Sequence, residues 1–150
     1  TALARASDYA SAIIVRGVEG GVIPSLNQPS KLFSYRAGGP DIEVRLDPAD
    51  YAIESSDRAV PLPQDLPQQK ADDAITGSID ADALAQAAAK AGLAALGGKA
   101  GPMRDSLVYG GALCLCQLGR CPDPVSASEQ VRRVLDNGQA GRRFHAVAVQ

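Results

Sequence analysis

Glycines and two charged residues follow the end of one short apolar run, and their types and spacing could do chemistry. The run Ala12–Val15 is followed by Arg16, Gly17, Glu19, Gly20 and Gly21. Ligands of open α/β sheets gather where strands end, and glycines there let a backbone approach an anion. The spacing matches neither a dinucleotide fingerprint nor a phosphate loop with its Lys-Ser/Thr pair. A substrate loop and a plain strand-to-loop turn are both open interpretations, and the residues alone favour the turn.

A second group of cations lies near the C-terminus and consists of Arg120, Arg132, Arg133, Arg142 and Arg143. Arginines could bind nucleic-acid phosphates, but near helix C-termini they also interact favourably with the helix dipole. Arg132 and Arg133 are about 100° apart on a helix, so a shared face is not guaranteed. Phe144 is the one aromatic residue near them, which gives little support to base stacking. Solvated helix caps and a nucleic-acid surface are therefore both open, with caps favoured.

Neither a metal site nor a catalytic nucleophile is predicted from the residues. Cys114 and Cys116 point to nearly opposite sides of a helix, so they cannot chelate one ion, and we expect buried small apolar side chains. The acidic pair Asp72-Asp73 lies in a setting typical of a linker. His145 is the only histidine and has no Ser or Cys nucleophile in a recognisable elbow.

Composition sets the broad class of the protein. The chain has 150 residues, of which 45% are hydrophobic and 21% charged, enough for one domain with a core. A net charge of -2 gives no global attraction to nucleic acid, and no apolar run is long enough to span a membrane. Three cysteines, an odd number, together with the lack of a visible signal peptide indicate a reducing, cytoplasmic location and no membrane partner.

The first half of the chain predicts strands. Ala12–Val15 is apolar on both faces, which is typical of a central parallel strand covered by helices. Residues 32–36 and 42–46 alternate and are joined by a glycine-rich turn, so they predict an antiparallel hairpin. No second fully apolar run exists to pair with the first. We therefore expect residues 1–150 to be a portion of one larger α/β domain, with the rest of its own polypeptide as partner.

The second half predicts three helices. An extended connection over residues 55–77 leads to a helix that begins near Asp80 and ends at Gly97-Gly98. Pro102 begins the next helix, which carries the adjacent glycines Gly110-Gly111 where two helices must touch. The last helix begins at a capping box from Ser126 or two residues earlier at Pro124. The predicted fold class is α/β, with a central strand, an antiparallel hairpin and three C-terminal helices.

Two segments carry a resemblance to a known family. Arg104-Asp105 opens an apolar helix rich in small residues, and Asp136-x-Gly138-x-Ala140 closes the last helix. This pattern resembles the C-terminal end of anthranilate phosphoribosyltransferases, of glycosyltransferase family 3. The resemblance implies the C-terminal portion of their α/β domain. The helical dimerisation domain and the phosphate-binding Gly-Thr-Gly-Gly-Asp loop would lie upstream, and the intact protein would be a homodimer.

The family also sharpens the loop after the apolar run. At this place its members carry a segment similar to His-Gly-x-Asp-Gly-Leu-Asp-Glu. The final Asp-Glu pair of that segment binds the magnesium of phosphoribosyl pyrophosphate. Arg16-Gly17 and Glu19-Gly20 match the first half, but the acidic pair falls on Val22-Ile23. Hard cations need oxygen ligands, so we expect no metal here and no activity from this chain alone. Active members of the family use magnesium to transfer phosphoribose to an amine.

An alternative is the divergent YbiB-type branch, which is similar to these transferases in fold but is described as binding nucleic acid. Loss of the metal-binding pair fits that branch better than a biosynthetic enzyme. A structural fragment without activity of its own is the third hypothesis.

Overall fold

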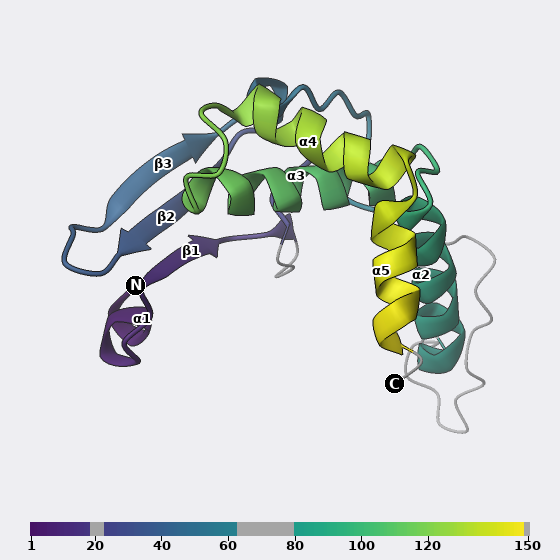
Figure 1. The fold of residues 1–150 in the computed structure, drawn as a ribbon, viewed down its shortest axis with the longest axis horizontal. Helices are drawn as coiled ribbons and strands as arrows, with labels where there is room; N and C mark the ends of the chain where they lie inside the picture. The colour runs from purple at the N-terminus through teal and green to yellow at the C-terminus, as the bar shows by residue number, and fades with distance from the viewer. Residues whose placement is uncertain (19–22, 63–79, 149–150) are drawn as a thin grey trace, which may run out of the picture.

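The computed structural model describes residues 1–18, 23–62 and 80–148. It is a mixed α/β arrangement of one sheet and several helices. Along the chain its elements are α1 (Ala2–Ala6), β1 (Ser11–Val15), β2 (Ser30–Arg36), β3 (Ile42–Leu46), the 3-10 helix η2 (Pro48–Tyr51), α2 (Ala81–Leu96), α3 (Pro102–Gln117), α4 (Pro124–Asp136) and α5 (Gln139–Ala148). The sheet lies on one side of the molecule, α3 and α4 run side by side in the middle, and α2 and α5 lie on the far side (Figure 1).

The sheet has three antiparallel strands in the order β1-β2-β3. The predicted hairpin is confirmed as β2 and β3, and Gly38 takes a positive φ of 78° in its turn. The prediction of a parallel central strand is wrong for the described ranges, where β1 is an edge strand that pairs antiparallel with β2. The chain turns back between β1 and β2, so the apolar run joins the hairpin instead of a parallel neighbour. Ile14 is accordingly 40% exposed.

The core lies between the sheet and the central helices. Tyr109 and Ala112 of α3 pack with Leu32 and Leu46 of the sheet, and Ala127 of α4 belongs to the same cluster. Tyr51 of η2 contacts Tyr109 with ring centroids 4.9 Å apart. On the other face of the sheet, the guanidinium of Arg5 from α1 lies 4.6 Å from the ring centroid of Tyr35.

Local signals set most helix boundaries. The Asp80 carboxylate accepts hydrogen bonds from the backbone N–H groups of Asp82 and Ala83 and so caps α2. Pro102 begins α3, as predicted, and Pro124 begins α4. Asp123 caps α4, so the alternative start at Ser126 is wrong, although the Ser126 backbone N–H does donate to Asp123.

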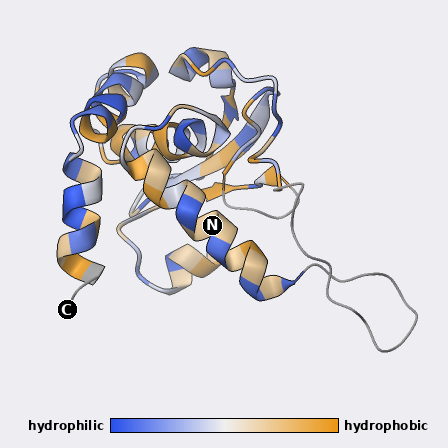
Figure 2. Cartoon of the chain, turned by 90° about the vertical axis from the view of Figure 1, so that its right-hand side faces the viewer, coloured by the Kyte–Doolittle hydropathy of each residue, from blue (hydrophilic) through white to orange (hydrophobic). Residues whose placement is uncertain are grey.

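Four helices follow residue 80 in the described chain, whereas three were predicted. The additional helix is α5, which carries hydrophilic residues in its first turns and hydrophobic ones near its end (Figure 2). Gly138 adopts a positive φ of 72° between α4 and α5, so the chain breaks there and resumes as a helix. None of the helices in residues 1–18, 23–62 and 80–148 is long and apolar enough to cross a membrane.

The adjacent glycines of α3 lie at two different contacts. A Cβ added to Gly111 would be 2.9 Å from Cγ2 of Val131 on α4, so the predicted close approach of two helices is confirmed there. The prediction of buried cysteines is wrong for Cys114, which is exposed, while Cys116 is half-buried. Burial raises the pKa of the Cys116 thiol.

Candidate anion-binding site

A cavity of about 250 Å³ lies where β1 ends. Three segments build it: the residues that follow β1, the loop that leads into β2, and the stretch after η2. Its lining residues include Arg16, Gly17, Ser25, Gln28, Ser30 and Arg58. The cavity therefore lies at the end of the apolar strand, where the sequence left a substrate loop and a plain turn both open.

Backbone hydrogen bonds hold these segments together. The N–H of Val18 donates to the carbonyl of Ile23 across 3.3 Å, which closes the base of the loop after β1. The N–H of Leu26 donates to the carbonyl of Arg58 across 3.0 Å and brings that arginine beside the loop. The side-chain amide of Asn27 donates to the carbonyl of Ser56 at 2.9 Å. Leu26 is only 1% exposed, so this junction is anchored in the core.

The charged residues in the described lining of the cavity are both arginines. Arg16 and Arg58 are exposed, and neither forms an ion pair with any of the described residues. No carboxylate is among the lining residues in the described part of the chain. The Ser30 hydroxyl is buried without a hydrogen-bond partner in the described part of the chain, whereas the Ser25 hydroxyl donates to the amide oxygen of Asn27 at 3.2 Å. Guanidinium groups and hydroxyl donors without carboxylates favour an anion as ligand.

The residues predicted for the substrate loop are only partly described. Arg16 and Gly17 line the cavity, and Gly17 is buried. Glu19, Gly20, Gly21 and Val22 lie outside the described residues. Ile23, at the second position of the family's acidic pair, lies against α3, since a Cβ added to Gly110 would be 2.9 Å from its Cδ1. It also lines a separate apolar cavity of about 610 Å³.

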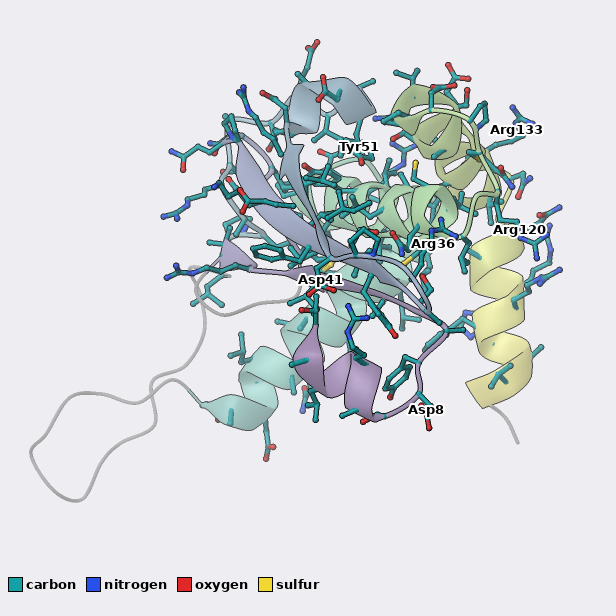
Figure 3. All side chains as sticks on the ribbon, turned by 90° about the vertical axis from the view of Figure 1, so that its left-hand side faces the viewer. Asp8, Arg36, Asp41, Tyr51, Arg120 and Arg133 are labelled. Atoms are coloured by element: carbon teal, nitrogen blue, oxygen red, sulfur yellow. The ribbon has the colours of Figure 1, made fainter. Side chains whose placement is uncertain are left out.

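The five C-terminal arginines have different surroundings. Arg132 donates to the backbone carbonyls of Tyr51, at 3.4 Å, and of Ala52, so it holds the end of η2 against α4. Arg133 and Arg120 are exposed and lie toward the same side of the molecule (Figure 3). Arg142 and Arg143 are exposed on α5. None of the five lines the cavity at the end of β1.

Sequence reasoning missed Arg58 and Ser30. Arg58 lies in a polar connection without a motif, and only the backbone bond between Leu26 and Arg58 brings it to the cavity. Within the described ranges there is no cluster of three or more His, Cys, Asp or Glu residues that could hold a metal ion. No protein-family model matches the chain, and no curated protein matches it either.

Proposed function

We propose that the chain is the C-terminal portion of the α/β domain of an anthranilate phosphoribosyltransferase-like protein, and that alone it does not transfer phosphoribose. One observation carries the family assignment. The guanidinium of Arg104, at the start of α3, lies 2.6 Å from the carboxylate of Asp136 at the end of α4, although the two are 32 residues apart. The two segments that resemble the family therefore meet in space.

The lack of activity follows from the loop after β1. In the family, transfer of phosphoribose depends on positioning of the donor and the amine acceptor, and on metal-assisted departure of pyrophosphate. In this chain the second acidic position holds Ile23, which packs on α3 and offers no oxygen ligand. An isoleucine in an apolar contact supports the loss of magnesium binding at that position.

The partner of this portion is proposed to be the rest of its own polypeptide, in a homodimeric cytoplasmic protein. Among the described residues, β1 has a strand neighbour on one side only. Beside it lies the apolar cavity of about 610 Å³, lined by Ile13, Val15, Ile23 and Leu107. An added strand would satisfy the open backbone edge and cover these side chains.

A test is to measure pyrophosphate release from phosphoribosyl pyrophosphate in the presence of magnesium and anthranilate. An active anthranilate phosphoribosyltransferase is the positive control. The chain is expected to release no more pyrophosphate than buffer does, and turnover that scales with its concentration would contradict the proposal.

Nucleic-acid binding, as in the YbiB-type branch, is the second candidate function. Its support is the exposure of four arginines, Arg120, Arg133, Arg142 and Arg143, none of which has an ion-pair partner in the described ranges. Cations on a surface bind nucleic-acid phosphates with a strong dependence on salt. Anisotropy titration with a labelled single strand at two salt concentrations tests this candidate, and undetectable binding at low salt would remove it.

A further inference from the structure

We infer that the cavity at the end of β1 is a metal-independent site for a phosphate monoester, bound by Arg16, Arg58 and Ser30. This site is independent of both proposed functions. It includes neither the positions of the family's acidic pair nor any of the C-terminal arginines. Its basis is the charge, the hydrogen-bonding capacity and the size of the cavity.

The charge of the cavity matches a dianion. Arg16 and Arg58 both line it and have exposed side chains, and no carboxylate is among the lining residues that the structure describes. A phosphate monoester carries close to two negative charges at neutral pH. Guanidinium donors form a planar fork that fits phosphate oxygens, so two arginines can each make paired hydrogen bonds to one phosphate group.

The Ser30 hydroxyl supplies a further donor. It is buried and has no hydrogen-bond partner among the described residues, which is unfavourable for a protein on its own. In the structure this oxygen is closed to the cavity, and a rotation of the Ser30 side chain about χ1 would bring it to a phosphate oxygen there, which would give it an acceptor. Gly17, which is buried at the same cavity, has no side chain to occupy the space beside the ligand.

The volume limits the ligand. Pockets for drug-sized molecules usually measure about 300–1,000 Å³. At about 250 Å³ the cavity is smaller, so it suits a phosphate group with at most a pentose attached. The phosphate could come from a free sugar phosphate or from the phosphorylated end of a nucleic-acid strand, since both present the same terminal group.

The experiment is a titration of the full chain with inorganic phosphate and with ribose 5-phosphate, in EDTA, followed by amide chemical shifts. Saturable shifts are expected at Gly17, Val18 and Ser30. Arg58→Gln should weaken binding about tenfold or more, and Arg58→Lys, which keeps the charge but loses the fork, should weaken it less. Arg45→Gln is the matched control, because Arg45 is exposed on β3 and does not line the cavity. It should bind as the parent chain does.

Ser30→Ala is a second variant, which keeps both arginines and should weaken binding by a smaller factor. Absence of saturable shifts, or an equal loss in Arg58→Gln and Arg45→Gln, would overturn the site, as would binding that requires magnesium. Two oligonucleotides, one with a 5′-phosphate and one with a 5′-hydroxyl, separate the sources. A preference for the phosphorylated strand assigns the site to strand ends, and tight binding of ribose 5-phosphate without that preference assigns it to sugar phosphates.

Discussion

Ile23 lies directly against Gly110, so that a Cβ added to this glycine would come within 2.9 Å of the isoleucine Cδ1. The two residues are far apart in the sequence, one in the loop after β1 and the other within α3. The absence of a side chain at Gly110 gives the isoleucine its place on the helix. The position at which the family resemblance would put a metal-binding carboxylate is thus used for apolar packing.

The same substitution should have different effects on stability at the two neighbouring glycines of α3. In Gly111→Ala the new methyl would lie 2.9 and 3.2 Å from the two methyl groups of Val131, whose branched side chain is stiff on a helix. The variant should lose about 1–3 kcal/mol of unfolding free energy. Gly110→Ala meets only the flexible tip of Ile23 and gains up to about 1 kcal/mol of helix propensity, so it should be close to neutral.

Urea unfolding measures both glycine variants. Adding Val131→Ala to Gly111→Ala should recover part of the lost stability, because it removes the two methyl groups that clash. Equal losses in Gly110→Ala and Gly111→Ala would mean that the contact of α3 with α4 does not depend on Gly111.

The Arg104–Asp136 pair should stabilise the protein more than a surface pair does. The side chain of Arg104 is only 15% exposed, so Asp136→Asn leaves a largely buried guanidinium without its charged acceptor and should cost about 1–3 kcal/mol. Asp41→Asn is the control, since Arg5 and Asp41 form a pair at nearly the same distance with both side chains more than a third exposed. Thermal unfolding should show a smaller loss of stability for that control, because solvent screens an exposed pair.

Two buried tyrosines predict a loss of stability at high pH. Burial raises the pKa of Tyr51 to about 12 and also raises the pKa of Tyr109. Unfolded tyrosines ionise near pH 10, whereas the folded chain holds these two neutral. Their contribution to the free energy of unfolding is therefore fully present below pH 10, and it is lost as the pH rises through about 12.

Tyr109→Phe tests this linkage. The Tyr109 hydroxyl is buried without a hydrogen-bond partner among the described residues, so its removal should be neutral or slightly stabilising at pH 7. The variant should also lose less stability in alkali than the parent chain, as followed by circular dichroism with tyrosinate absorbance. A parent chain in which all four tyrosines ionise near pH 10 while it stays folded would rule out the assigned burial.

The exposed C-terminal arginines should set any affinity of the protein for nucleic acid. Replacing Arg133, Arg142 and Arg143 by Ala should lower the affinity and reduce its dependence on salt, without changing sequence preference. Glu19→Ala should leave binding equal or slightly tighter, since it removes a negative charge. Arg132→Ala is the contrast: its side chain bonds to η2, so thermal stability should fall. If the triple variant gives unchanged anisotropy titrations at both salt concentrations, these arginines do not bind nucleic acid and serve as helix caps.

Local signals made much of the fold predictable. The turn between residues 32–36 and 42–46, the Asp80 cap and the prolines at the starts of α3 and α4 act within a few residues, and the hairpin, the cap and both helix starts are present in the structure. The alternation did not predict burial on β3, because residues 42–45 are all exposed. The direction of β1 depends on where the chain returns after Val15, which no local pattern specifies. Arg16 and Gly17 could be found because they follow a strand. Arg58 could not, because a tertiary hydrogen bond places it beside the loop.

The most direct test of the central claim is isothermal calorimetry of the chain with phosphoribosyl pyrophosphate, once with magnesium and once with EDTA. We propose that Val22-Ile23 replaces the acidic pair of the family, which predicts no saturable heat that depends on magnesium. Any weak binding through the phosphate of the ribose should be the same in both buffers. Saturable micromolar binding that appears only with magnesium would contradict the claim that this portion has lost the family's metal site.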